Sequence, residues 1–454
     1  MKIGYFILFI FTLLACQGKM PPNYESDVAN IIVDSLQVQW LKHVKTTGRI
    51  SSNHYSDFVV DSNHNSYIAC FATGPDRVDY IYIVKISAEG ETLWELNKNK
   101  GRACAIAIDR EGNIWVTGYY IDHIQFDEYS KSGGSGVFLA KFNKKGQCLQ
   151  LITGEGGGIG FNCHVNNAGE VIISGVLDAR LRFGDQEIIN VEKNVNNFIA
   201  LFDRQGNCKW IRKTEGNINR IISDENGDFY LAGTFSIDMK YNNLKISTTE
   251  SYDNDAFLLK INTQGKGLWL QQFGNPGITR SAYRTSESGF DLMLQPNGNI
   301  IVIATTEEPT KIDDLLQVNN NINVKLNIVE FNPNGVLIKE RIIAQNIRES
   351  TMATLCRTSD GSYYISFTTN KQSKIGDQTF QFDTDRHGVI AAFDQNWNLK
   401  DILYSENNED VMFRESYALD SCVYFTGHFR GDFILKDQKV NGSENHSLFL
   451  LNLK

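Results

Sequence analysis

The sequence lacks the motifs by which several common activities are recognised. It contains no C-x-x-C spacing, no paired-histidine zinc motif, no nucleophile elbow, no Walker loop and no dinucleotide fingerprint. Its formal net charge is −9, and lysine and arginine are interspersed with acidic residues without forming a basic stripe. Binding to a phosphate backbone depends on clustered basic side chains. We therefore expect no nucleic-acid partner, and we predict no cofactor, no resident metal and no catalytic residue.

A paired cysteine framework is also missing. Besides Cys16 the chain has seven cysteines, an odd number that cannot all pair with one another. Most lie among alternating apolar residues, as in ACAIAI (103–108), where a cysteine behaves as a small buried hydrophobe. The sequence leaves open whether a single disulfide forms, for example between Cys70 and Cys104.

Long apolar runs are absent except at the start of the chain. Residues 3–14 form an apolar run too short to span a bilayer comfortably, and Lys2 precedes it. The following LLAC, ending at Cys16, resembles a bacterial lipobox, which implies cleavage before Cys16 and a lipid on its side chain and new amino group. An ordinary secretory signal or a short membrane anchor is the alternative. Several acyl chains at one terminus would hold a domain firmly at a membrane.

These features divide the chain into three parts. Residues 1–15 are expected to be a lipoprotein signal peptide, 16–36 a lipidated terminus and tether, and 37–454 one domain. The expected location is the outer membrane of a bacterial envelope. Residues 17–19 do not provide the acidic run that resembles a surface-export signal of some Bacteroidota lipoproteins, which favours the periplasmic face without settling it.

Internal repetition is the strongest signal in the sequence. Seven copies of a segment such as DREGNIWVTG (109–118) occur, in which an Asx-rich turn separates runs rich in Val, Ile, Phe and Tyr. The turn positions are His64, Gly112, Gly169, Gly227, Gly298, Gly361 and Ser421. A second turn follows in each unit, as in AKFNKKG (140–146). No helical periodicity of useful length occurs outside the leader.

The pattern of turns and apolar runs therefore predicts four strands in each unit. Four-stranded units repeated around an axis form a β-propeller. The seventh unit ends at Lys454 after three strands, whereas VQWLKHVKTTG (38–48) is an outer strand without a unit. We predict an all-β, seven-bladed β-propeller with four strands per blade, closed by the N-terminal strand completing the last blade. Trp40 would then occupy the place held by Trp94, Trp210 and Trp269.

The repeat pattern resembles that of the SBBP (seven-bladed β-propeller) repeat family. It combines D-x-x-G-N-x-[WY]-[VL]-[TA]-G, a middle element such as RFGDQEI (182–188), and a third element ending in G-x-x-x-W. The resemblance covers residues 37–454 and is strongest in units two to four. It implies the propeller fold and a place in the bacterial envelope, and it implies no single activity.

Candidate metal and histidine sites are weak. DSNHN (61–65) and DENGD (224–228) place oxygen atoms at alternate positions but lack the bidentate Glu of a 12-residue calcium loop. Turn chemistry already explains them. His54 and His164 are expected near the central channel, where they could face one another, although single histidines are usually structural.

Arginines at the start of the inner strands form the one constellation that suggests a site. At a channel mouth they would suit carboxylate or sulfate groups; alternatively they pair with acidic neighbours such as Asp57 and Glu415. The candidates are Arg102, Arg220, Arg284, Arg348 and Arg414. The longest interval between turn positions, from Gly227 to Gly298, also contains a loop in which Arg280 and Tyr283 are candidate binding residues.

The function expected from these features is binding. We predict a lipid-anchored envelope propeller, monomeric and non-enzymatic, that binds or scaffolds a protein or glycan partner. The alternative is a polysaccharide-processing lyase or glycoside hydrolase with its site at the channel mouth. The fold alone does not decide between them. Strongly shifted pKa values in the channel would favour the enzyme.

Overall fold

The computed structural model describes residues 36–45, 56–190, 197–247, 254–273, 291–308, 323–348, 352–384, 386–406, 411–443 and 446–454. Every regular element in these ranges is a β-strand, so the predicted all-β class is confirmed. No helix capable of crossing a membrane is found in this part of the chain.

Units 1 and 2 form one seven-stranded antiparallel sheet, in the order β10-β9-β6-β5-β4-β3-β2. Its strands are β2 (Asp57–Val60), β3 (Ser66–Thr73), β4 (Asp79–Ile86), β5 (Thr92–Ile108), β6 (Ile114–Tyr120), β9 (Gly136–Phe142) and β10 (Cys148–Thr153). Units 3 and 4 form separate four-stranded sheets. They consist of β11 (Gly158–Val165), β12 (Val171–Leu177), β15 (Asn197–Phe202) and β16 (Cys208–Thr214), and of β17 (Asn217–Ser223), β18 (Phe229–Ser236), β21 (Asn254–Ile261) and β22 (Gly267–Phe273).

Units 5 and 6 share a nine-stranded sheet. Its strands are β23 (Asp291–Leu294), β24 (Ile300–Glu308), β25 (Asn323–Phe331), β26 (Leu337–Ile347), β27 (Thr354–Arg357), β28 (Tyr363–Ile375), β29 (Gln378–Gln381), β30 (Gly388–Phe393) and β31 (Leu399–Tyr404). In the sheet of unit 7, the N-terminal strand lies beside the C-terminal one. Its order is β1 (Val38–Val44), β36 (Ser447–Leu453), β33 (Cys422–Phe429) and β32 (Met412–Leu419).

The continuous strand β5 differs from the two separate strands that the sequence suggests. Its first half pairs with β4 up to Lys100, and its second half pairs with β6 from Gly101 onward. Asn99 and Gly101 have positive φ angles of 65° and 140°. These two residues let the strand change direction without ending, so it serves both units.

Short hairpins add to the four strands of several units. They lie between the second and third strands, where the sequence carries RFGDQEI and its counterparts. Each has a two-residue turn whose first residue has positive φ, such as Gly184 at 56°. The hairpins are β7 (His123–Phe126) with β8 (Tyr129–Ser132), β13 (Arg180–Phe183) with β14 (Gln186–Ile189), β19 (Asp238–Tyr241) with β20 (Leu244–Ser247), and β34 (Asp432–Leu435) with β35 (Gln438–Asn441).

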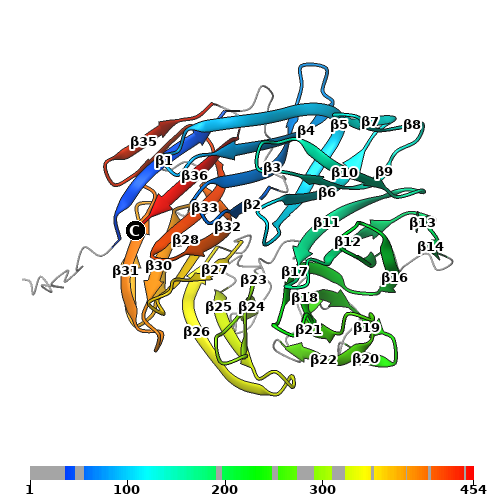
Figure 1. Cartoon of the computed structure of the whole chain (residues 1–454). Coiled ribbons are helices and arrows are strands. Elements are labelled where there is room, and N and C mark those ends of the chain that lie inside the picture. The colour runs from blue at the N-terminus through cyan, green and yellow to red at the C-terminus, as the bar shows by residue number, and fades with distance from the viewer. Residues whose placement is uncertain are drawn as a thin grey trace, which may run out of the picture.

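The inner strands of the units lie around a common centre (Figure 1). Each inner strand contacts the next one in the series β2, β5, β11, β17, β23, β27 and β32, and β32 in turn contacts β2. The apolar cores lie between neighbouring units. The core between units 7 and 1, for example, brings Tyr424 and Leu450 together with Phe58 and Val84.

Tryptophans on four outer strands each bind one unit to the next. Each indole Nε1–H donates to a carbonyl two residues before the second-turn glycine of the following unit. These contacts are Trp40 to Ala88 (2.8 Å), Trp94 to Lys144 (3.1 Å), Trp210 to Thr263 (2.9 Å) and Trp269 to Pro333 (3.1 Å). Trp40 therefore makes from β1 the contact that the other three make from their own units.

Candidate functional site

Each of the seven units has an inner-strand residue at the same position of the repeat. This residue pairs with the one just before the last position of the repeated segment, which is Gly118 in DREGNIWVTG. In unit 4 this is Arg220, which pairs with Ala232 beside Gly233. Because the inner strands lie around one centre, we call these seven residues the central layer. In unit order they are Asp57, Ala105, Asn162, Arg220, Asp291, Thr354 and Glu415.

Arg220 joins three units across the central layer. Its Nε lies 2.9 Å from Oδ1 of Asp291 on the neighbouring strand β23. Its Nη1 lies 2.7 Å from Oε2 of Glu415 on β32, which belongs to a more distant unit. The guanidinium is three-quarters buried, with 27% of the side chain exposed, so both pairs are shielded from bulk water.

Two carboxylates of the layer also fasten neighbouring inner strands together. Asp57 Oδ2 accepts a hydrogen bond from the backbone N–H of Ile106 on β5 (3.0 Å). Asp291 Oδ2 accepts one from the backbone N–H of Leu355 on β27 (2.8 Å). Each acid therefore satisfies a buried backbone donor as well as carrying charge.

Burial sets the protonation of this layer. It raises the pKa of Asp57 to about 6, although Arg220 opposes the shift. Burial also raises the pKa of Glu415 to about 8. The charge of Arg220 opposes this shift, and the charges of Asp57 and Asp291 add to it. Burial therefore favours the protonated form of both acids, while the charge of Arg220 favours their ionised form.

His164 lies close to the layer but not in it. Its Nε2 is 2.9 Å from the hydroxyl of Ser223, and its ring packs edge-on against Phe229. Burial, with a smaller contribution from Arg220, lowers the pKa of His164 to about 4, so the imidazole is neutral at pH 7. His54, its predicted counterpart, lies outside the described residues.

The structure does not place the described candidate arginines at one level of the channel. Arg102 pairs with Tyr119 in the strand register and forms an ion pair with Asp79, with Nη2 2.7 Å from Oδ2. Arg414 occupies a bulge beside Glu415 and directs Nη1 to the sulfur of Met352. Arg348 follows β26, and its backbone N–H donates to Thr368. Arg220 pairs with Glu415, one of the acids that the sequence offered as alternative partners for the arginines. Ligand binding by these arginines stays a prediction.

Several other predicted positions are outside the described ranges. They are Cys16, Arg280, Tyr283 and Arg284. The seven remaining cysteines, Cys70 and Cys104 included, are free thiols. Burial raises the pKa of both these thiols to about 12.

The Asx-rich turns use their carboxylates locally. Asp61 accepts backbone hydrogen bonds from Asn63 and Asn65 at 2.9 and 3.0 Å. Asp224 does the same in its own turn and pairs with Lys260 at 3.0 Å. Across the residues that the structure describes, no group of three or more His, Cys, Asp or Glu side chains is arranged to hold a metal ion.

Asp291 is the charged residue of the layer that sequence reasoning missed. A signal for it exists, because Asp57, Arg220 and Asp291 each stand seven residues before the turn position of their unit. Reading that column across all units would have placed the three side chains at one level.

Comparisons with known proteins give a fold likeness and no family. No family model matches the chain, and no curated protein matches it. Virginiamycin B lyase from Staphylococcus aureus is 11% identical with a TM-score of 0.47, over 92% of this chain and 99% of that one. YCF48 bound to D1 peptide is 8% identical with a TM-score of 0.44, over 92% and 96%. An ulvan lyase, from a new polysaccharide lyase family, is 12% identical with a TM-score of 0.42, over 90% and 96%. At these values the likenesses carry no information about substrate or partner.

Proposed function

We propose that this chain is a seven-bladed β-propeller of the SBBP repeat kind, held at the bacterial outer membrane by lipid on Cys16. In this proposal it binds or scaffolds a protein or glycan partner and catalyses no reaction. The antiparallel pairing of β1 with β36, which runs from Val38–Leu453 to Val44–Leu448 with one register shift between Val38 and Trp40, supports closure of the ring. The core shared by units 7 and 1 supports it further.

The observation that carries the non-enzymatic role is the bridge made by Arg220. A catalytic acid or base must reach the proton that it transfers. In the central layer, Arg220 instead engages Asp291 and Glu415, and Asp57 accepts hydrogen bonds from backbone N–H groups. These contacts give the charged centre a structural task and leave recognition to the loops and outer surfaces, where binding residues are usually found.

A pulldown from membranes tests this function. Full-length protein carrying a C-terminal tag is captured from detergent extracts of cells that were, or were not, treated with protease while intact. We expect a specific partner to be recovered, and protection from the protease would place the protein on the periplasmic face. If no partner is recovered while the purified protein degrades a polysaccharide, the proposal is wrong.

A polysaccharide-processing enzyme is the second candidate, favoured by the raised pKa values of Asp57 and Glu415. Acids that hold a proton near neutral pH are typical of general acids, although structural ion-pair networks also shift pKa values. Replacing Glu415 with Gln keeps the hydrogen-bond acceptor for Arg220 but removes the acid. Loss of polysaccharide cleavage in this variant, with cleavage present in the parent, would establish the enzyme.

A further inference from the structure

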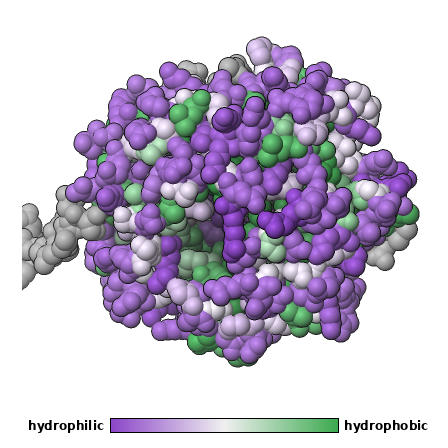
Figure 2. Space-filling model, in the orientation of Figure 1, coloured by the Kyte–Doolittle hydropathy of each residue, from purple (hydrophilic) through white to green (hydrophobic). Residues whose placement is uncertain are grey.

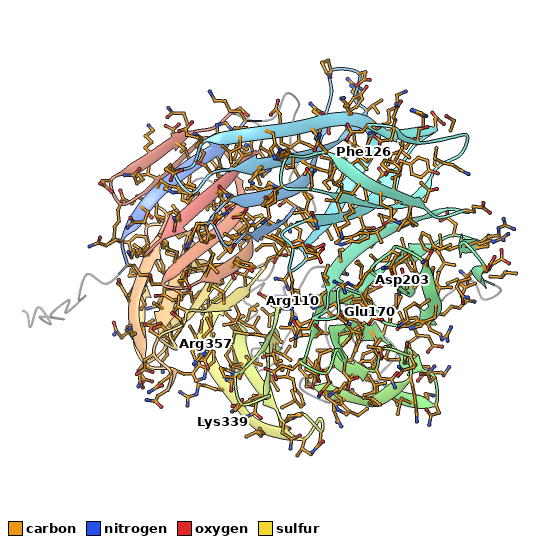
Figure 3. The ribbon with its side chains drawn as sticks, viewed as in Figure 1. Arg110, Phe126, Glu170, Asp203, Lys339 and Arg357 are labelled. Atoms are coloured by element: carbon orange, nitrogen blue, oxygen red, sulfur yellow. The ribbon has the colours of Figure 1, made fainter. Side chains whose placement is uncertain are left out.

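A cavity of about 250 Å³ opens between the turns of units 2 and 3. Its lining includes Arg110 and Glu111 from the first turn of unit 2, and Asn167 and Gly169 from the first turn of unit 3. Arg204, from the second turn of unit 3, completes that side. All of these lining residues are polar, charged or glycine. Figure 3 labels Arg110 toward the middle of the view, and it labels Glu170 and Asp203 of unit 3.

Most charges around this cavity are paired within the protein. Lys141 Nζ lies 3.0 Å from Asp109 Oδ2, a pair that recurs in unit 4 as Lys260 with Asp224. Arg204 Nη2 lies 3.3 Å from Glu111 Oε1 and so joins unit 3 to unit 2.

Arg110 is the exception. Its side chain is exposed, and throughout the described residues its guanidinium has neither an ion-pair nor a hydrogen-bond partner. The lining contains three cations, Arg110, Lys141 and Arg204, against the two acids Asp109 and Glu111. The cavity therefore has one positive charge in excess, on a side chain whose donors suit a carboxylate or sulfate.

The shape of the cavity depends on unit 3. Leu201 stands where units 2 and 4 have Lys141 and Lys260, so unit 3 has no lysine at this place. Gly169 has a φ of 79°, and a Cβ there would lie 3.0 Å from Nε of Arg204. A side chain at position 169 would therefore displace the guanidinium that joins the two units.

We infer that this cavity binds a single acidic sugar residue, whose carboxylate or sulfate contacts Arg110. The inference rests on the proposed binding function and names a ligand class for it. The volume is below that of a typical drug-sized pocket and suits one ring. The polar lining offers acceptors at Glu111 and an amide at Asn167 for the ring hydroxyls. Excess positive charge selects an anionic sugar over a neutral one.

Calorimetric titration of the full-length protein in detergent tests this inference. The probes are trigalacturonate for the carboxylate, a sulfated galactose trisaccharide for the sulfate, and neutral galactotriose. We expect an anionic probe to bind at least tenfold more tightly than galactotriose. Arg110→Ala should abolish that preference, Arg110→Lys should retain part of it, and Asn167→Trp, which fills the cavity, should weaken all binding.

Arg180→Ala is the matched control, because Arg180 is another exposed arginine, 52% exposed and 3.6 Å from Glu187. It should bind like the parent. Equal affinity for acidic and neutral probes, no binding of either anionic probe, or an Arg110→Ala variant that binds like the parent would overturn the inference. Recovery of a partner in the membrane pulldown despite such a result would leave the proposed function standing.

Discussion

At the scale of single residues, Arg220 is the most consequential side chain of the centre. It is the cation of the central layer, and removing it would leave Asp291 buried without its counter-charge and Glu415 without its guanidinium partner. Breaking one partner of a buried ion pair costs about 3–5 kcal/mol. We therefore predict that Arg220→Met lowers the free energy of unfolding in urea by an amount near that range.

Arg102→Met provides the comparison for this prediction. Arg102 pairs with a single carboxylate, and 34% of its side chain is exposed. Its replacement should cost about 1 kcal/mol or less, as is usual for more exposed pairs. Equal losses in the two variants would show that the bridge across the centre has no special role.

Glu415 predicts a dependence of stability on pH. Its pKa is about 8 in the folded protein and 4.5 when unperturbed, so the folded state holds the proton more tightly. Stability from this group is complete below about pH 4.5 and decreases as the pH rises toward 8. Glu415→Gln should unfold at nearly the same temperature as the parent at pH 5 and at a higher temperature at pH 8.5. An identical pH profile for parent and variant would contradict the assigned shift.

The sequence predicted a residue of the central layer where the repeat pattern drew attention to it. The sequence indicated Arg220 as one of the arginines near inner-strand starts and Glu415 as one of the acids that could pair with those arginines, without joining the two. Asp291 was overlooked, although it stands at the same distance before its turn position as Arg220, and strand register places it at the level of Arg220 and Glu415. The partner of Arg102 was also hidden, because Asp79 belongs to a different unit.

At the scale of elements, β1 completes the sheet of unit 7. Deleting residues 37–48 would leave β36 as an unpaired edge and remove the Trp40 contact to Ala88. We predict a lower melting temperature, with amide hydrogen exchange accelerated most in β36 and β33. An unchanged melting temperature, or acceleration spread evenly over all units, would contradict this assignment.

The bend in β5 gives a second test at this scale. Gly101 has a φ of 140°, and a Cβ there would lie 2.1 Å from the carbonyl oxygen of Tyr119. Gly101→Ala should therefore destabilise the protein by about 1–3 kcal/mol, as expected for backbone strain. Gly134 also has positive φ, 96°, but a Cβ there meets nothing within 4 Å, so Gly134→Ala should cost less. Urea denaturation measures both, and the reverse order would contradict the account.

Secondary-structure elements were predictable where the local sequence pattern determines them. The Asx turns and alternating apolar residues predicted the main strands. Whether two successive strands merge, as in β5, depends on two left-handed residues rather than on hydrophobic pattern. The extra hairpins are only four residues per strand, too short for a clear period.

At the scale of the molecule, the repeat units pack through cores that lie between neighbours. Unit 2 meets unit 3 through Val137 and Phe198, and unit 6 meets unit 7 through Ile390 and Phe425. In the orientation of Figure 1, the visible face is mostly hydrophilic with a hollow near its middle (Figure 2). In the proposed binding role, such a body would present loops to a partner while its cores hold the units in place. The repeats made the arrangement of the units predictable, whereas the proposed ligand class depends on side chains that the repeat does not fix, such as Arg110.

The central claim is that the two ends of the domain meet in one sheet. Gln37 and Lys454 exchange backbone hydrogen bonds of 3.1 and 3.0 Å, and both side chains are exposed. Full-length protein with Gln37→Cys and Lys454→Cys should be joined within one molecule by a short bis-maleimide, as identified by peptide mass spectrometry. A control carrying Gln37→Cys and Lys339→Cys, on β26 of unit 5, should not be. Absence of the 37–454 link, or its formation only between molecules, would contradict a ring closed by β1.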